Sequence, residues 1–588
     1  MTQPFRQAWD LVVSSRLTIA AFVVLGASYA IYRALLPKPF PGVPYDKAAS
    51  KTVFGDLASF KKEGNGNFLD WATRRAISHG TPLCQIFIPL HQPVLILSDY
   101  REAQDIFMRQ TKIWDRSDWS IARLGAGLPR HHINMKTDDG WKSNRRLIQD
   151  LMSAPFLHNV AAPNLYESTQ DLIQLWAAKA RLAHGKPFSA SKDIFHAALD
   201  AVLAFSFGDS FPHRALTPQV ELVQAPGSGL FESSYVPQEP VVFEEAPLHE
   251  TLMATLHVAV NIGQAINSMS PGLVSMWQKI EPLSTRMRGI RVRYIEQQIT
   301  QAVERLEGRV LEEDLASTKG LKSAVDLMVS REKRFAIKEG RAPNYQSNEM
   351  NDEVAGFVVA GHDTTSTTLL WALKFLTDNS QAQTKLREAL HKAHQAASQE
   401  NRMPNVEEIV KTSIPYLDAF NEEVLRCSCT IPSTSRQCSQ DTTVLGHVVP
   451  KGTTMLILNA GPCITHPGHS ISESIRSKSC QAAAKERGVR EWDPRGIDQF
   501  DPERWLVSEG EHTSFDSTAG PTLAFGVGLR GCYGRKLAYL EMRIIMTLFV
   551  WNFEFMQCPE ELSSYDPVEE LTRKPKMCYI RLKPLGHD

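Results

Sequence analysis

The sequence predicts a mostly α-helical protein with small β-sheets, preceded by one amino-terminal transmembrane helix. The long central part repeats apolar residues at intervals of three and four, the period of amphipathic helices. Short runs of strand-forming residues, bounded by turn residues, lie before and after that part. Near the amino terminus an uncharged apolar segment is about 20 residues long, which is enough to span a bilayer.

The apolar segment covers residues 17–32 and continues to residue 36 if Arg33 reaches toward lipid headgroups. A cleaved signal peptide is the alternative, because Ser28 and Ala30 resemble a cleavage site. The length of the segment and the unpaired cysteines after it favour an anchor, while the flanking basic residues leave its orientation open. We therefore expect an anchor over residues 1–36, a Pro-rich hinge over 37–48 and a folded body over 49–588.

Local patterns place the elements of the body. Strands are predicted at residues 85–88 and 94–97, before a helix at 101–108. Further helices are predicted at 165–183, 193–207, 250–269 and 285–306, and further strands at 442–449, 453–458 and 577–582. Prolines, glycines and serines predict long loops at 211–247 and 466–492.

Composition excludes several classes of protein. Lys and Arg total 64 against 65 for Asp and Glu, so no overall charge draws the chain to nucleic acid. Hydrophobic residues make up 43% and charged residues 22%, as in a folded globular protein. The nine cysteines are scattered without a CxxC pair, which argues against a disulfide framework. No Asn-x-Ser/Thr sequon is present, which favours a cytosol-facing body.

A glycine-rich turn carries one cysteine just before a helical pattern. Its sequence is Phe525-Gly-Val-Gly-Leu-Arg-Gly-Cys532-Tyr-Gly534. Backbone N–H groups at a helix start stabilise negative charge and therefore a thiolate that could bind a metal. Arg530 could neutralise an anionic group on a flat ligand, which glycines allow to approach the backbone.

This turn resembles the haem-ligand signature of the cytochrome P450 superfamily, and the chain looks most like its membrane-anchored fungal members. The match lies at Phe525, Gly528, Arg530, Cys532 and Gly534. The resemblance implies a P450-like haem-thiolate catalytic domain over residues 49–588. It also implies heme b (iron protoporphyrin IX), with Cys532 as the axial thiolate to the iron and Arg530 on a propionate.

Two other interpretations of the turn are weaker. Cys532 could be a buried structural cysteine, although five matching positions before a helix argue against this. Gly526, Gly528 and Gly531 also satisfy the GxGxxG dinucleotide fingerprint, but too little chain follows for a dinucleotide-binding half-domain.

A polar stretch interrupts an apolar helical pattern over residues 354–371. Glycine and hydroxyl side chains there predict a locally distorted helix. Alone, the stretch could also be a Thr-rich cap between two helices. It resembles the oxygen-binding stretch of the superfamily, at Ala360, Gly361, Asp363, Thr364 and Thr365. The resemblance implies that Asp363 and Thr364 relay protons during O–O bond cleavage, with Ala360 and Gly361 beside the cofactor.

Further matches concern structure and propionate binding. Glu423 and Arg426 stand three residues apart, and Arg504 lies in a Pro-Glu-Arg-Trp element, where the superfamily has Phe as the last residue. The resemblance implies that these three residues form a buried ionic network that holds the core. It also places Trp141 and Arg145, from a Trp-x-x-x-Arg pair, and Arg436 beside the propionates.

These matches imply a monooxygenase that inserts one oxygen atom from O2 into an apolar small molecule, in secondary metabolism. No flavin or nicotinamide domain follows, so we expect electrons from an NADPH-dependent flavoprotein reductase at the endoplasmic reticulum membrane, with the catalytic domain in the cytosol. A haem-thiolate isomerase or dehydratase that does not use O2 is one alternative. A non-catalytic, membrane-tethered haem binder is another.

Overall fold

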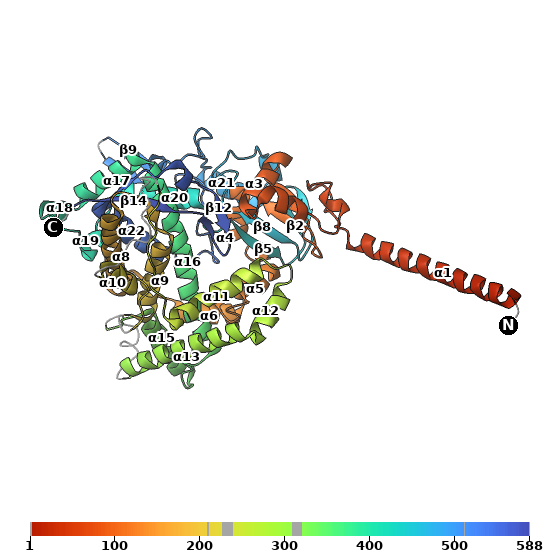
Figure 1. Ribbon diagram of the computed structural model, residues 1–588. Coiled ribbons are helices and arrows are strands. Elements are labelled where there is room, and N and C mark those ends of the chain that lie inside the picture. The colour runs from red at the N-terminus through yellow and green to blue at the C-terminus, as the bar shows by residue number, and fades with distance from the viewer. Residues whose placement is uncertain (1–2, 209–210, 226–238, 308–319, 511, 587–588) are drawn as a thin grey trace.

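The computed structural model describes residues 3–208, 211–225, 239–307, 320–510 and 512–586. Helix α1 (Gln3–Leu35) projects from the body as a separate rod, beside the sheet-containing part of the molecule (Figure 1). The long helices gather on the other side, and the carboxyl terminus lies far from the amino terminus. The mostly α-helical fold with small sheets is as predicted.

The exposed side chains of α1 are strongly apolar. Ile19, Phe22, Val23, Val24 and Leu25 are each at least 63% exposed. Even so, no helix within the described ranges is both long enough and apolar enough to cross a membrane. The predicted transmembrane helix is therefore not confirmed.

The segment after α1 is irregular, as its prolines predict, but it is tied to the body. The buried amide of Gln85 donates to the carbonyls of Phe40 (3.0 Å) and Val43 (2.8 Å) and accepts from the Phe40 N–H. These bonds fix the direction in which the chain enters the first strand.

The main sheet has five strands in the order β1-β2-β8-β5-β3. Their bounds are β1 (Leu83–Ile86), β2 (Val94–Leu97), β3 (Trp114–Asp115), β5 (Ser433–Cys438) and β8 (Thr454–Leu458). Strands β2 and β8 are parallel, and the other neighbours are antiparallel. The first strand thus begins and ends two residues before its predicted position.

One predicted strand is a pair of strands in the structure. Residues 442–449 make a hairpin of β6 (Thr442–Val444) and β7 (His447–Val449). Leu445 and Gly446 have φ values of 47° and 80°, so the chain reverses between them.

Small sheets complete the β structure. Strand β14 (Tyr579–Pro584) pairs with β11 (Phe553–Met556) and β4 (Phe188–Ser189), and it replaces the strand predicted at 577–582. The remaining pairs are β9 (Leu506–Glu509) with β10 (His512–Phe515), and β12 (Pro567–Glu569) with β13 (Arg573–Pro575).

Helix α16 (Asn348–Asp378) is the axis of the helical part. It packs against α9 (Ser191–Phe207), α20 (Pro415–Ser428) and α22 (Arg535–Asn552), and α8 (Ala162–Ala183) packs against α9 and α22. In the described ranges the other α-helices of five residues or more are α3 (Phe68–His79), α4 (Tyr100–Met108), α5 (Asp118–Leu124), α6 (Asp139–Ile148), α10 (Thr217–Gln224), α11 (Glu250–Ile266), α12 (Pro271–Ile280), α13 (Pro282–Arg305), α15 (Ala324–Glu339), α17 (Ser380–Ala393), α18 (Gln395–Gln399), α19 (Val406–Lys411) and α21 (Lys478–Arg487).

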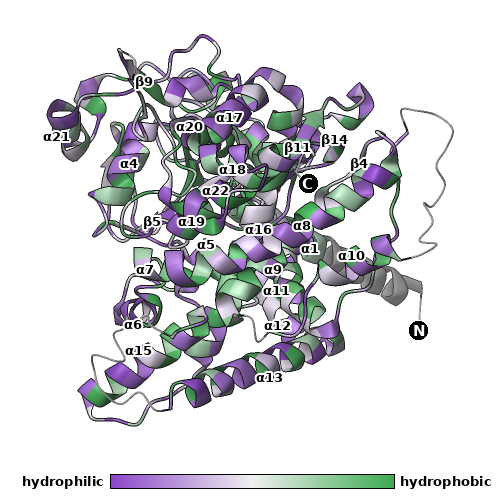
Figure 2. Cartoon of the chain, turned by 90° about the vertical axis from the view of Figure 1, so that its left-hand side faces the viewer, coloured by the Kyte–Doolittle hydropathy of each residue, from purple (hydrophilic) through white to green (hydrophobic). Residues whose placement is uncertain are grey.

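Side-chain pattern explains which face each helix buries. In Figure 2 hydrophilic and hydrophobic residues alternate along α13. Its buried positions recur at three and four residue intervals, from Arg291 through Tyr294, Ile295, Gln298, Ile299 and Ala302.

Both predicted loops contain helices. Helix α10 lies within 211–247, where Pro218 occupies the first turn, and residues 226–238 of this segment lie outside the described residues. Helix α21 lies within 466–492 and begins after Ser477, whose side chain accepts from the Cys480 N–H. Proline and serine predict loops there, but both residues also occur at the beginning of helices.

Candidate functional site

The cysteine turn is closed by its own backbone. The Cys532 N–H donates to the Phe525 carbonyl at 2.8 Å, and the Gly531 N–H donates to the Gly528 carbonyl at 3.0 Å. Gly528 has a φ of 75°, and a Cβ there would lie 2.3 Å from the Phe107 carbonyl at the end of α4. Glycine is therefore required at this position. Helix α22 begins directly after Gly534.

Cys532 differs from every other cysteine. All nine lie within the described residues and are free, and only Cys532 is exposed. It nevertheless lies inside the body, where burial raises the pKa of its thiol. The backbone N–H groups of Gly534 and Arg535 and the nearby Arg145 cation act in the opposite direction, because they favour the thiolate. The thiol can thus be reached by a ligand and is surrounded by groups that stabilise its anion.

Four arginines converge near the turn, and we call them the arginine cluster. They come from four segments: Arg116 follows β3, Arg145 lies in α6, Arg436 in β5 and Arg530 in the turn. Burial and mutual repulsion lower the pKa of Arg116 and Arg530 to about 9 and that of Arg436 to about 10, although Asp115 opposes this. Their charges are therefore under-compensated by the protein.

Donors without acceptors accompany this excess of positive charge. The buried Nε of Arg116 and Nε1 of Trp141 have no hydrogen-bond partner among the residues that the structure describes. Trp141 is packed beneath the guanidinium groups of Arg145 and Arg530, at 5.7 and 5.0 Å from its ring. This donor set suits a ligand with two carboxylates.

The sequence predicted three of the four arginines but not Arg116. Its Nε lies in the interior because the short strand β3 pairs with β5, with Asp115 opposite Gln437. No local motif marks Arg116, so only the tertiary structure reveals it.

The polar stretch of α16 remains helical, and the predicted distortion is wrong. The hydroxyl of Thr364 donates to the Ala360 carbonyl at 2.6 Å, and that of Thr368 to the Thr364 carbonyl at 2.9 Å. These bonds lie along the helix without opening its backbone ladder. Ala360 is exposed in the middle of an otherwise buried helix, so this face of α16 is open.

Gly361 serves helix packing. A Cβ at Gly361 would lie 2.8 Å from a methyl group of Val202, so the glycine lets α16 approach α9. The predicted contact of Gly361 with a cofactor has no support from this geometry.

A hydrogen bond from the β12–β13 hairpin holds the carboxyl group of Asp363. Its Oδ2 accepts from the Thr572 hydroxyl at 2.9 Å, and Thr572 also shares a hydrogen bond of 2.7 Å with Thr367. Burial raises the pKa of Asp363, while the Thr572 bond and the Lys574 cation lower it. The carboxyl is thus buried but within the influence of charged groups at the surface.

Comparisons with known proteins agree with this geometry. The cytochrome P450 family model matches residues 53–461 and 497–581. The chain belongs to the cytochrome P450 family. It is 38% identical to cytochrome P450 monooxygenase TRI13 of Fusarium sporotrichioides, over 95% of this chain and 97% of the relative. It is 35% identical to cytochrome P450 monooxygenase xilC of Penicillium rubens, over 96% of both chains.

The fold agrees with the family as well. A crystal structure of a cytochrome P450 (CYP102L1) superposes with a TM-score of 0.64 at 18% identity, covering 94% of this chain and 99% of that one. The chain is accordingly a haem-thiolate monooxygenase, an oxidoreductase. An accessible thiol at a helix start and a cationic cluster with free donors fit a haem with two propionates.

One buried glutamate of this P450 was not predicted from the sequence. Glu541 lies in α22, is 2% exposed and accepts from the Thr365 hydroxyl at 2.8 Å. Burial raises the pKa of Glu541 to about 7. The sequence did contain a signal for this residue. Glu541 stands nine residues after Cys532, on a helix face that is otherwise apolar.

A second unpredicted cluster joins α16 to the loop before α6. Glu353, fully buried, accepts from the His132 N–H at 2.7 Å and from the Asn144 amide at 2.9 Å, and its other oxygen lies 2.7 Å from His132 Nδ1. His131, His132 and Glu353 have donor atoms close enough to hold a metal ion. Because protein groups already occupy the carboxylate, we interpret the cluster as a clamp on this loop.

The clamp supports the arginine cluster. Arg530 donates to the Met135 carbonyl at 2.9 Å, in the same loop as His132. Burial lowers the pKa of His132 to about 3 and of His131 to about 4, so both imidazoles are neutral. The clamp therefore adds no positive charge beside the arginines.

Glu423, Arg426 and Arg504 form a buried network. Arg426 makes two bonds to Glu423, at 2.8 and 2.7 Å, and Arg504 adds a third at 3.0 Å. Burial opposes ionisation of Glu423, but these cations together hold its pKa below the ordinary value. Trp505 replaces the family's Phe, and its Nε1 donates to Glu423 at 2.9 Å, a bond that Phe cannot make.

Proposed function

We propose that Cys532 ligates the iron of heme b and that the arginine cluster holds its propionates. The observation that carries this proposal is the exposure of Cys532 alone among the nine cysteines, at the start of α22. The neighbouring N–H groups and Arg145 favour the thiolate required for ligation. Trp141, Arg145, Arg436 and Arg530, together with Arg116, supply the donors for two carboxylates.

The reaction is the insertion of one oxygen atom from O2 into an apolar small molecule. Bound haem supplies the activation of O2. The open face of α16 at Ala360 gives the substrate room, and the hydroxyl of Thr364 is one turn away. The buried carboxyl of Asp363 accepts protons from the Thr572 side and passes them toward Thr364.

Electrons come from an NADPH-dependent flavoprotein reductase, and the enzyme acts in secondary metabolism at the endoplasmic reticulum. Fungal cytochrome P450 monooxygenases that match over nearly the whole chain support the metabolic role. The exposed apolar side chains of α1 support attachment to the membrane by residues 1–36, with the body in the cytosol.

Turnover with labelled oxygen tests the reaction. With a reductase, NADPH and ¹⁸O2, the product should contain one labelled oxygen atom. Thr364→Ala should keep NADPH consumption but lower the yield of product per NADPH about tenfold, because proton transfer is worth one to several orders of magnitude in rate.

The same experiment separates the alternatives. An isomerase or dehydratase would form product without NADPH and without label. A non-catalytic haem binder would show no reductase-dependent use of O2. Unchanged coupling in Thr364→Ala would contradict the relay while leaving the cofactor assignment intact.

A further inference from the structure

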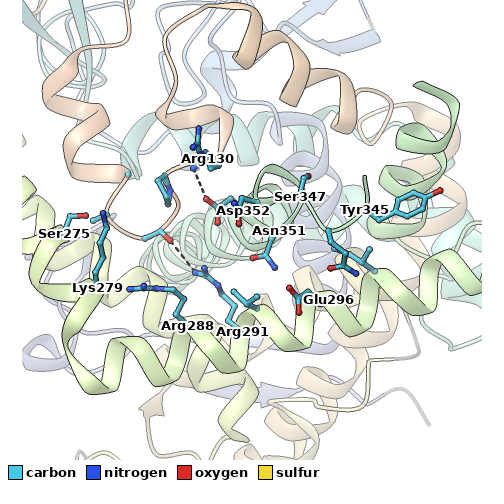
Figure 3. Close-up of a pocket in the computed structure, with 18 residues that line it drawn as sticks. Arg130, Ser275, Lys279, Arg288, Arg291, Glu296, Tyr345, Ser347, Asn351 and Asp352 are labelled. Atoms are coloured by element: carbon cyan, nitrogen blue, oxygen red, sulfur yellow. Dashed lines mark hydrogen bonds between the residues drawn. The ribbon is translucent and has the colours of Figure 1, made fainter. Parts of the chain in front are cut away.

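A pocket of about 350 Å³ lies between α13, the end of α12, the start of α16 and the loop at residues 125–130 (Figure 3). None of its lining residues belongs to the cysteine turn or the arginine cluster. Its lining is therefore distinct from the residues assigned to haem. Its size is at the lower end of the range for pockets that hold small organic ligands.

The pocket carries more positive than negative charge. Arg130, Lys279, Arg288 and Arg291 line it, against the carboxylates of Glu296 and Asp352. Glu349 lies 3.9 Å from the Arg130 guanidinium at the exposed rim, and Asp352 accepts from the Arg130 N–H at 2.8 Å. Within the described part of the chain, the Arg288 guanidinium bonds only a neutral group, the Gln278 carbonyl at 2.9 Å.

Arg291 is the most informative residue of this set. It occupies the buried face of α13 and is 5% exposed. Among the described residues, its Nη1 reaches only the Gly127 carbonyl, at 3.5 Å, and its Nε has no hydrogen-bond partner, while the Asp352 carboxylate partly balances its charge. Leaving a donor of a buried cation unpaired is costly, so a functional reason is expected.

A second free donor faces the same space. The Nδ2 of Asn351 is buried and has no partner in the described parts of the structure, and Asn351 lines the pocket close to Asp352. Asn351 lies in the first turn of α16, whose cap residue Ser347 also lines the pocket. The amino-terminal end of this long helix adds a partial positive charge.

We propose that this pocket binds a small organic anion, a carboxylate or a phosphate monoester. Its charged head lies between Arg288, Arg291 and Asn351, and its apolar part packs against Val292 and Ile299. The site is additional to the monooxygenase function proposed above and does not depend on it.

Titration calorimetry of the purified haem-loaded protein tests this proposal. The probes are phenylacetate and phenyl phosphate, with uncharged phenylacetamide as the matched control ligand. We expect one equivalent of an anion to bind and phenylacetamide to bind at least tenfold more weakly, because charged hydrogen bonds would be lost. The stronger of the two anions identifies the head group.

Two variants locate the binding site. Arg291→Gln and Arg288→Gln should each weaken anion binding about tenfold or more, while Arg495→Gln, in an exposed ion pair with Asp493, should not. Arg288 is exposed, so its variant should fold even if Arg291→Gln does not, and the haem absorption spectrum checks folding of each. Absence of anion binding, or binding that is unchanged in Arg288→Gln or shifts the haem spectrum, would overturn the proposal.

Discussion

Single residues carry the chemistry of this P450, and several act through burial. Glu541 combines a fully apolar setting with one hydroxyl donor, so its carboxyl keeps a proton near neutral pH. Asp363 and Cys532 are likewise shifted by burial, but N–H groups, hydroxyls or cations moderate the shift. Burial thus raises the pKa of all three groups, and at Asp363 and Cys532 neighbouring donors and cations oppose that rise.

Glu541 should make stability depend on pH. Its pKa is raised from 4.5 to about 7, so the folded chain binds a proton that the unfolded chain releases between these values. The stabilisation is complete below pH 4.5 and is lost as pH rises through 7. Glu541→Gln cannot ionise, so its free energy of unfolding relative to the native protein should rise by about 2.5 kcal/mol between pH 5 and 8.

Denaturant unfolding of both proteins at several pH values measures this difference. Glu570→Gln, in an exposed pair with Lys574, is the control and should show little pH dependence. A constant difference between Glu541→Gln and the native protein would show that Glu541 does not hold a proton.

At the scale of elements, much of the fold follows from local pattern. Helices α8, α9, α11 and α13 agree with their predicted ranges within a few residues, because their apolar faces are buried along their whole length. Strand β2 has its predicted bounds, and β8 begins one residue after its prediction. The strands predicted at 85–88, 442–449 and 577–582 shifted or split, because cross-strand pairing and a left-handed turn at Leu445 and Gly446 set their bounds. Propensity cannot foresee such tertiary constraints.

Some residues of the candidate site could likewise be predicted from local sequence patterns, and others could not. Motif residues such as Cys532, Arg145 and Arg530 could be named from spacing, since each stands in a short pattern. Arg116 and Glu353 could not, because the loops and helices that bring them to the site are far apart in sequence. The packing of Gly361 against Val202 could not be predicted, because sequence does not show which helix face meets α9.

The element η6 (Pro502–Trp505) gives a prediction at this scale. Trp505→Phe keeps the ring packing but removes the hydrogen bond to the Glu423 carboxylate. We expect a loss of about 1.5–3 kcal/mol in the free energy of unfolding. Urea titration followed by haem absorbance measures it.

Trp71→Phe is the matched control. Trp71 is also buried, but its Nε1 has no partner, so this change removes no hydrogen bond. An equal loss of unfolding free energy in both variants would mean that Trp505 stabilises the protein by packing and not by its bond to Glu423.

At the scale of the whole molecule, α1 and the body are distinct. The body encloses the cysteine turn and α16, while α1 extends away from it with its apolar side chains exposed (Figure 1). Such a surface is unfavourable in water and favourable against lipid. The hydrogen bonds of Gln85 to Phe40 and Val43 attach the chain to the body just after the predicted anchor.

Removal of residues 1–36 should therefore move the protein from the microsomal pellet to the supernatant without loss of haem. Centrifugation of cell extracts, with haem absorbance of both fractions, gives the result. Deletion that leaves the protein in the pellet at low and high salt would contradict attachment through α1.

The central claim is that the Cys532 thiolate binds the haem iron, and the reduced carbon monoxide difference spectrum tests it most directly. The native protein should show the band near 450 nm that is characteristic of thiolate ligation, and Cys558→Ala should keep it, since Cys558 lies elsewhere and is only half-buried. Cys532→Ala should lose this band completely. A 450 nm band that survives in Cys532→Ala would contradict the account.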